Sequence, residues 1–314
     1  MPTSRTLLTQ HSVNRGGVRL ALWEKRPARS RPPPARTLLL VHGATFSGRV
    51  TFDIQGKDPL PYSLMDILAA SGYDVFAVDL EGYGSSDHPD HPCPTEIAVQ
   101  DVEATMTYLC RLRAVERVHL LGFSWGTQIA GCAAVRTPDR VHRLILFAPI
   151  SVSSPWLTAN RPHLDRYRAE PRRPNIRSEL EARLKGMPPA GSIRPDVLKR
   201  YLAFAIEVDP SSPNGCLVDC LTRMPLFDYG QLSVPTLLVH GEHDDVSLQA
   251  DLTERFRQIA HPFKIYAHLP ALGHLALLQE RRDLLYRAIL DFLALPDWPI
   301  RARRARPVSP LRGR

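Results

Sequence analysis

The feature that most constrains the fold is a series of short, almost fully apolar runs, separated by segments long enough to form helices. The runs are Thr37–Val41, Val75–Asp79, Arg117–Leu121, Leu144–Phe147, Thr236–His240 and Lys264–Ala267. A strand that is apolar throughout is buried on both faces, which is typical of a parallel sheet. Helices are predicted between the runs, at Ser63–Ala70, Ile97–Arg111, Gly126–Val135, Leu248–Gln258 and Leu275–Ala294. The sequence therefore predicts an α/β fold: a mostly parallel central sheet with helices on both faces.

A hairpin is expected ahead of this sheet. Two alternating runs, Leu7–Val13 and Val18–Trp23, flank the segment Asn14-Arg15-Gly16-Gly17. Asparagine and glycine tolerate the positive φ that a tight turn requires, so the two runs should pair in antiparallel fashion.

A long insertion interrupts the strand rhythm between Phe147 and Thr236. Prolines, arginines and aromatic residues mix there with helical patterns at Ser178–Lys185 and Pro195–Val208. The segment is too long for a plain loop, so we expect a separate helical layer over the carboxyl edge of the sheet. The expected organisation is core at 1–150, helical cap at 151–228, core again at 229–298 and a basic tail at 299–314.

The distribution of charge indicates the class of partner. The formal net charge is +8, but the tail from Arg301 to Arg314 holds six arginines and no acidic residue, so the remainder carries only +2. An arginine- and proline-rich tail without apolar periodicity is typical of a solvated, disordered appendage. The nearly neutral body predicts a small-molecule partner rather than nucleic acid or a membrane. The sequence does not indicate the oligomeric state.

The five cysteines, at positions 93, 110, 132, 216 and 220, show no CxxC or Cys/His spacing of a zinc site, so no metal is predicted. Cys216 and Cys220 stand one helical turn apart, which leaves a pairing open. The first residues lack the layout of a signal peptide, and no apolar run approaches the ~20 residues of a membrane span. We therefore expect a cytoplasmic protein.

The chemistry is carried by Gly122-Phe123-Ser124-Trp125-Gly126, which lies directly after a predicted strand and before a predicted helix. In a G-x-S-x-G turn of this kind the glycines remove Cβ clashes, and the serine hydroxyl is left at the tip. The amino end of the next helix points its N–H groups at the same place. This context favours Ser124 as a nucleophile.

With this motif, the chain resembles the α/β-hydrolase superfamily over roughly residues 37 to 280. Four further stretches carry the resemblance: His42-Gly43-Ala44-Thr45 after a strand, Asp79-Leu80-Glu81-Gly82-Tyr83-Gly84-Ser85-Ser86, His240-Gly241-Glu242-His243-Asp244, and Gly273-His274. The order Ser, Asp, His along the chain is also that of this fold. The resemblance implies a triad of Ser124, Asp244 and His274. The resemblance selects Asp244 over its neighbour Asp245. Some members of the superfamily place the acid after the sixth strand instead, but here the corresponding stretch, Ala148–Ser154, contains no carboxylate.

The roles follow from the resemblance and from general chemistry. His274 would take the proton of Ser124, and Asp244 would hold the imidazole in the required tautomer. The oxyanion hole would use the backbone N–H groups of Trp125 and Ala44, the latter being less determined within the His42–Thr45 loop. Trp156, Tyr201 and Phe204 are candidates for the pocket lining, although each aromatic ring equally suits packing of the cap on the core.

The expected function is hydrolysis of a small carboxylic ester, thioester or lactone through an acyl-enzyme, without a cofactor, since no dinucleotide or phosphate-binding motif is present. The serine at the turn sets the chain apart from dehalogenases and epoxide hydrolases of the fold, which use aspartate. The His42-Gly43-Ala44-Thr45-Phe46 loop departs from the HGGPG loop of proline iminopeptidases. Two alternatives stay open: a carbon–carbon bond hydrolase with the same triad, and a non-catalytic ligand receptor of the same fold.

Overall fold

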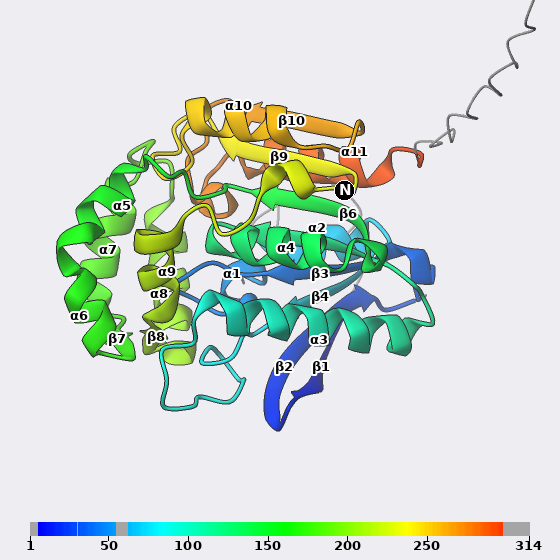
Figure 1. Ribbon diagram of the computed structural model, residues 1–314, viewed down its shortest axis with the longest axis horizontal. Coiled ribbons are helices and arrows are strands. Elements are labelled where there is room, and N and C mark those ends of the chain that lie inside the picture. The colour runs from blue at the N-terminus through cyan, green and yellow to red at the C-terminus, as the bar shows by residue number, and fades with distance from the viewer. Residues whose placement is uncertain (1–5, 30, 55–61, 298–314) are drawn as a thin grey trace, which may run out of the picture.

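The computed structural model describes residues 6–29, 31–54 and 62–297 (Figure 1). The tail predicted at 299–314 lies outside the described residues. An eight-stranded sheet crosses the molecule in the order β1-β2-β4-β3-β5-β6-β9-β10. Its strands are β1 (Thr6–Arg15), β2 (Val18–Pro27), β3 (Thr37–Val41), β4 (Asp74–Val78), β5 (Val118–Phe123), β6 (Val141–Phe147), β9 (Thr236–Gly241) and β10 (Lys264–Leu269).

Strand direction divides the sheet into two parts. β1 pairs with β2 and β2 with β4 in antiparallel fashion, while β4, β3, β5, β6, β9 and β10 are parallel neighbours. Gly16 and Gly17 form the predicted hairpin turn, both with positive φ, of 58° and 96°. The mostly parallel sheet predicted from the apolar runs is confirmed.

Helices cover both faces because each central strand sends alternate side chains to opposite sides. In β3, Leu39 and Val41 join the core beneath α3 (Thr95–Arg113) and α4 (Trp125–Arg136), and the same face carries α10 (Gln249–Gln258). Leu38 and Leu40 join the core beneath α1 (Gly48–Phe52), α2 (Leu64–Ala70) and α11 (Arg282–Ala294). Short 3-10 turns complete the core, at Pro34–Arg36, Pro138–Arg140, Tyr229–Gln231 and Ala276–Leu278.

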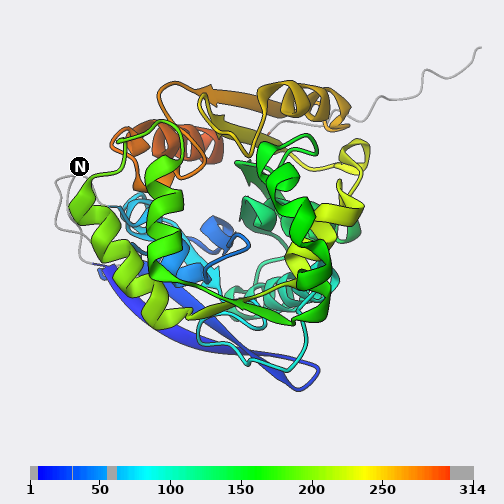
Figure 2. The ribbon, with the colours of Figure 1, turned by 90° about the vertical axis from the view of Figure 1, so that its left-hand side faces the viewer.

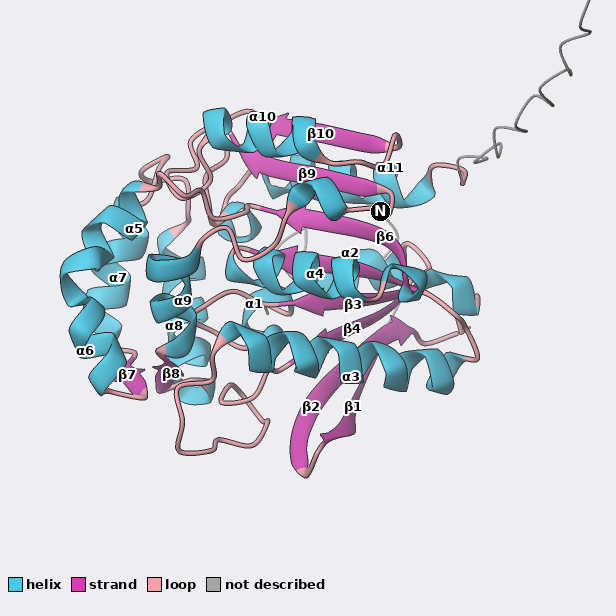
Figure 3. Ribbon diagram, viewed as in Figure 1, coloured by secondary structure: helices cyan, strands magenta, loops and turns pink. Residues whose placement is uncertain are grey.

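The insertion after β6 is mostly helical and lies beyond the carboxyl ends of the parallel strands (Figures 1 and 3). Its elements are α5 (Pro155–Asn160), a 3-10 turn (Arg161–His163), α6 (Leu164–Ala169), β7 (Arg172–Pro174), α7 (Arg177–Gly186), α8 (Pro195–Val208), β8 (Ser211–Pro213) and α9 (Gly215–Arg223). Seen end-on, α5, α6 and α9 stand on one side and α7 and α8 on the other, with the β7–β8 pair between them (Figure 2). The limits 151–228 for a separate cap stay a prediction.

Two details differ from the sequence-based expectations. The helix predicted over Leu275–Ala294 is a 3-10 turn followed by α11, because the buried Gln279 side chain between them is bonded to other loops: its Oε1 accepts the N–H of Gly273, and its Nε2 donates to Ser192 Oγ. All five cysteines are free and buried, so Cys216 and Cys220 are not paired. Within the described residues, no helix is both long and apolar enough to cross a membrane.

Close packing of α4 against β3 predicts a stability effect at Gly126. A Cβ there would collide with the backbone carbonyl oxygens of Val41 and His42, neither of which can move without disturbing the sheet. Gly126→Ala should lower the free energy of unfolding by about 2 to 3 kcal/mol. Gly186→Ala is the control, since a Cβ at Gly186 meets nothing within 4 Å. Urea denaturation curves that show equal stability for the two variants would contradict this packing.

Candidate active site

The turn between β5 and α4 holds Ser124 in an unusual backbone conformation, with φ 55° and ψ −120°. A positive φ is costly for a residue with a side chain and persists only where the surroundings impose it. Gly122 and Gly126 supply that constraint, because a Cβ at Gly122 would collide with the backbone of Gly126, and one at Gly126 with the carbonyl of Val41. The G-x-S-x-G pattern is thus required by the crossing of strand and helix, and it places the Ser124 hydroxyl beyond the end of β5.

The structure brings the three residues of the predicted triad together from three separate loops. His274 Nε2 lies 2.9 Å from Ser124 Oγ, and His274 Nδ1 lies 3.0 Å from each carboxylate oxygen of Asp244. A carboxylate only accepts hydrogen bonds, so the imidazole proton belongs on Nδ1 and Nε2 is left as an acceptor for the serine hydroxyl. All three side chains are buried or nearly so.

Asp244 is held as an anion by its loop. Burial alone would raise the pKa of Asp244, but the charge and hydrogen bond of His274, together with N–H bonds from Ser247 and Val246, lower it overall. Those two amides donate to Oδ1 at 2.8 and 2.9 Å. Asp245, the competing acid, makes no hydrogen bond to His274, and its Oδ1 is buried without a partner among the described residues.

The loop after β3 lies against the serine, as a Cβ built on Gly43 would be 3.2 Å from Ser124 Cβ. His42 fixes the start of this loop: its Nδ1 donates to the Gly43 carbonyl at 2.8 Å, and its Nε2 accepts the Leu80 N–H at 3.2 Å. Burial lowers the pKa of His42 to about 4, so the ring is neutral at neutral pH. His42 therefore serves to fix the fold of this loop. Across the described residues, neither the Ala44 N–H nor the Trp125 N–H is bonded to another group.

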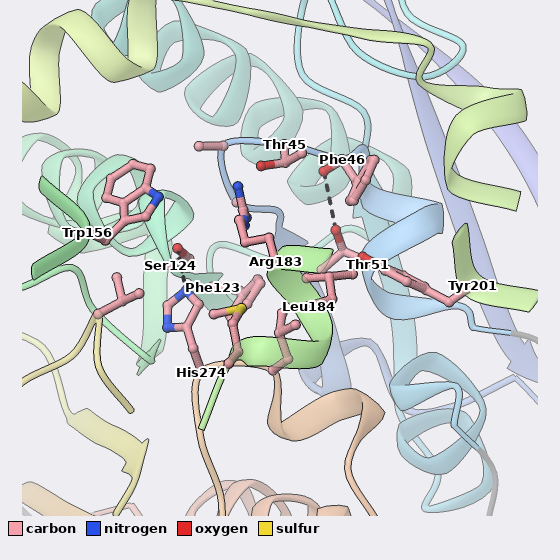
Figure 4. A pocket seen from close by; sticks show the side chains of 15 residues that line it. Thr45, Phe46, Thr51, Phe123, Ser124, Trp156, Arg183, Leu184, Tyr201 and His274 are labelled. Atoms are coloured by element: carbon pink, nitrogen blue, oxygen red, sulfur yellow. Dashed lines mark hydrogen bonds between the residues drawn. The ribbon is translucent and has the colours of Figure 1, made fainter. Parts of the chain in front are cut away.

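A pocket of about 630 Å³, including its open mouth, connects this centre to the insertion. Its walls include Ser124, His274 and Ala44 from the core and Trp156 and Tyr201 from the insertion (Figure 4). Phe204, the third aromatic residue predicted to line the pocket, does not do so. It lies one helical turn after Tyr201 and packs beneath the guanidinium of Arg49, 5.5 Å from the ring centre, because that stretch of α8 faces α1.

Several residues that line the pocket were not predicted from the sequence, among them Phe123 and Arg183. The Phe123 ring centre lies 5.3 Å from that of His274, and no sequence signal distinguishes the x positions of the turn. Arg183, on α7, lines the pocket next to the buried Leu184 and forms no hydrogen bond or ion pair with another described residue (Figure 4). Arg183 is exposed to solvent, and the pKa of its guanidinium is lowered by a partial loss of hydration and by the nearby charge of Arg173.

One cluster of potential metal ligands occurs in the described part of the chain, away from this pocket. Ligand atoms of Glu81, His91 and Cys93 lie within 4.8 Å of one another. Glu81 already forms an ion pair with Arg15 and lies 2.7 Å from His91 Nε2. Burial raises the pKa of Cys93 to about 12, which opposes the thiolate form that binds metals. The cluster fits an ion-pair network better than a metal site.

The chain is similar to known proteins both in sequence and in structure. The model of the alpha/beta hydrolase family matches residues 38–288. A 2-hydroxymuconate semialdehyde hydrolase of Pseudomonas putida is 30% identical over 226 residues, 68% of this chain and 73% of that protein. A 2-hydroxy-6-oxo-2,4-heptadienoate hydrolase of Pseudomonas putida strain F1 is 25% identical over 233 residues, 71% and 79% of the two chains.

Solved structures agree on the fold. A 2-hydroxy-6-oxo-6-phenylhexa-2,4-dienoate hydrolase from Rhodococcus sp. strain RHA1 superposes with a TM-score of 0.68 at 18% identity, over 93% of this chain and all of the other. A thermophilic esterase from Thermogutta terrifontis gives a TM-score of 0.66 at 21% identity, over 91% and 98% of the two chains. With a family match that spans most of its length, this chain belongs to the alpha/beta hydrolase family and is an enzyme.

Proposed function

We propose that the protein is a serine hydrolase that cleaves a small carboxylic ester, thioester or lactone through an acyl-enzyme intermediate. The observation that carries the proposal is the continuous chain of hydrogen bonds from Asp244 through His274 to Ser124 at the wall of a pocket. Such a chain converts a hydroxyl, which is a weak nucleophile at neutral pH, into an attacking group.

The proton follows the bonds just described. As Ser124 Oγ attacks the substrate carbonyl, His274 Nε2 accepts its proton, and the ionised Asp244 stabilises the imidazolium that results. The same proton then passes from His274 to the leaving group. Water completes the cycle in the reverse sense: His274 takes a proton from water, hydroxide adds to the acyl carbon, and Ser124 leaves with the proton returned.

Negative charge on the carbonyl oxygen requires donors fixed in advance. The N–H of Trp125, at the amino end of α4, and that of Ala44, in the loop against Ser124, are the proposed pair. Both are backbone groups on elements locked by close packing, so little reorganisation is needed when the charge forms.

The pocket lining supports a substrate with an apolar part and an anionic group. Leu184, Val246 and Leu275 join the aromatic walls, whereas Arg183 supplies a cation that has no ion-pair partner among the described residues. A guanidinium binds carboxylates well because its fork of donors matches their geometry. We therefore infer that esters of dicarboxylic acids are better substrates than neutral esters of the same length.

A second candidate, hydrolysis of a carbon–carbon bond next to a carbonyl, is favoured by two observations. The two Pseudomonas putida relatives that span about 70% of the chain are hydrolases of a 2-hydroxy-6-oxo-dienoate and of a muconate semialdehyde. Arg183 provides a cation for the carboxylate that the first name specifies. Turnover of a 2-hydroxy-6-oxo-dienoate at a kcat/KM at least ~100-fold above that of any p-nitrophenyl ester would favour this candidate over the esterase.

The first test of the proposal is Ser124→Ala. Removal of the nucleophile should lower kcat for p-nitrophenyl acetate by at least ~1000-fold and abolish labelling by a fluorophosphonate probe, because triad losses cost orders of magnitude. The melting temperature should change little, since the hydroxyl contributes little packing. Retention of more than a tenth of the activity would contradict the assignment.

The aromatic walls should set chain-length preference. Trp156→Ala and Tyr201→Ala are expected to change the ratio of kcat/KM between butyrate and octanoate esters by ~10-fold, equivalent to about 1.4 kcal/mol. Phe204→Ala is the matched control on the same helix as Tyr201, because its ring packs against Arg49 outside the pocket. A profile that shifts equally in all three variants would show that the insertion acts only through its overall stability.

Arg183 should favour anionic esters over neutral ones. Arg183→Gln is expected to lower kcat/KM for mono-p-nitrophenyl succinate by ~30-fold or more, about 2 kcal/mol, and to leave p-nitrophenyl butyrate within ~3-fold. Arg177→Gln makes the same change on the same helix outside the pocket and should leave both values near wild type. Equal effects of Arg183→Gln on both esters would show that Arg183 does not bind the carboxylate.

A further inference from the structure

Three residues of the loop that follows β3, Ala44, Thr45 and Ser47, are held by the insertion as well as by the core. Arg173 Nη2 donates to the Ala44 carbonyl at 2.8 Å, and Ser212 Oγ donates to the Thr45 carbonyl at 2.7 Å. The carboxylate of Asp209 accepts both the N–H and the hydroxyl of Ser47, at 2.8 and 2.7 Å. Arg173 lies in β7, Ser212 lies in β8, and Asp209 stands two residues before β8 begins. We call these contacts the loop clamp.

Arg173 is itself fixed within the clamp. It pairs with Ser212 across the antiparallel β7–β8 ladder, and its Nη1 donates to the Pro213 carbonyl at 2.7 Å and to Asn214 Oδ1 at 3.2 Å. A guanidinium already held by two bonds at the end of this ladder loses little entropy when it makes a third, to the Ala44 oxygen. The position of the Ala44 carbonyl is therefore coupled to the position of the β7–β8 pair.

The peptide plane transmits this contact to the peptide that directly follows the candidate oxyanion donor, the Ala44 N–H. In a trans peptide the C=O and N–H point in opposite directions, so a donor fixed on the Ala44 oxygen fixes the direction of the Thr45 N–H. It also polarises that peptide and makes its N–H a stronger donor. The adjoining peptide, which bears the Ala44 N–H, is fixed by the bond from His42 to the Gly43 oxygen. Ala44 thus lies between a peptide oriented by the core and one oriented by the insertion.

We propose that Arg173 is a positioning residue for the oxyanion hole, through which the β7–β8 pair of the insertion sets the geometry of the loop beside Ser124. This inference rests on the proposed serine hydrolase function. Tyr83 Oη also donates to the Ala44 carbonyl, at 3.1 Å and from the core side, so loss of Arg173 weakens the constraint without removing it. The expected effect is accordingly smaller than the loss of an oxyanion donor itself.

Arg172 provides the matched control. It is the preceding residue of β7 and equally half-buried, but its guanidinium donates to the Gly82 carbonyl and to Ser211, not to the loop after β3. Arg172→Gln removes the same charge from the same strand. Arg173→Lys keeps the charge but loses the fork that spans the ladder and the Ala44 oxygen, and it serves as the second variant should Arg173→Gln fold poorly.

The experiment compares wild type with Arg173→Gln, Arg173→Lys and Arg172→Gln in four measurements. These are kcat and KM for p-nitrophenyl acetate, the inhibition constant of an alkyl boronic acid, the rate of fluorophosphonate labelling, and the melting temperature. A boronic acid forms a tetrahedral adduct on the serine and so reports on the site in its transition-state geometry. Arg173→Gln should lower kcat by ~10- to 100-fold, leave KM within ~3-fold and weaken boronic acid binding by the same factor as kcat/KM. Arg173→Lys should lie closer to Arg173→Gln than to wild type, and Arg172→Gln should stay within ~3-fold of wild type.

The outcomes distinguish failure of the proposed hydrolase function from failure of the positioning role of Arg173. A wild-type chain whose Ser124 neither reacts with the fluorophosphonate nor turns over ester contradicts the proposed function, and this inference with it. An active wild type in which the Arg173 variants lose no more kcat than Arg172→Gln contradicts the inference alone. A loss confined to melting temperature and KM, with boronic acid binding unchanged, assigns Arg173 to the stability of the insertion and likewise overturns the positioning role.

Discussion

The close crossing of α4 over β3 at Gly126 is the contact on which the rest of the site depends. It leaves no space for a side chain at Gly126, and the backbone of Gly126 leaves none at Gly122 in β5, so the chain between them must reverse within a few residues. Ser124 adopts a strained backbone conformation because the close packing at Gly122 and Gly126 forces the chain through this turn. The strain has a geometric result: the hydroxyl projects beyond the strand ends, where the loops after β3, β9 and β10 converge. The Asp244 and His274 loops then need only the ordinary parallel order of the sheet to reach it.

The insertion does two things at this edge of the sheet. Its helices extend both cores, since α9 packs with the α3 and α4 side while α7 and α8 pack with the α2 and α11 side. Between them it supplies Trp156, Tyr201 and Arg183 to the pocket. Its β7–β8 pair also bonds to the core loop next to the serine. With the proposed role of Arg173, the insertion contributes both to the pocket and to the geometry of that loop.

Much of this arrangement was predictable because it rests on local rules. Apolar runs such as Thr37–Val41 identify buried parallel strands, and a glycine-flanked serine between a strand and a helix has one recurring geometry. The remainder depends on contacts between distant segments. Nothing in Ser178–Lys185 distinguishes Arg183 from the exposed charges beside it, and the three-residue strands β7 and β8 are too short for a pattern. The prediction that Phe204 lines the pocket was wrong, because helical spacing does not show whether a residue one turn after Tyr201 faces the pocket or α1. The limits of the cap and the catalytic roles stay predictions.

The central claim, that Ser124 carries the acyl group, is tested most directly by trapping the intermediate. The protein would be mixed with an excess of a slowly deacylating ester, quenched in acid within the first turnovers and digested for mass spectrometry. The account predicts the acyl mass on the peptide containing Ser124, and none in a His274→Ala variant treated in the same way. An acyl group on a different residue, or turnover with no adduct at any quench time, would contradict it.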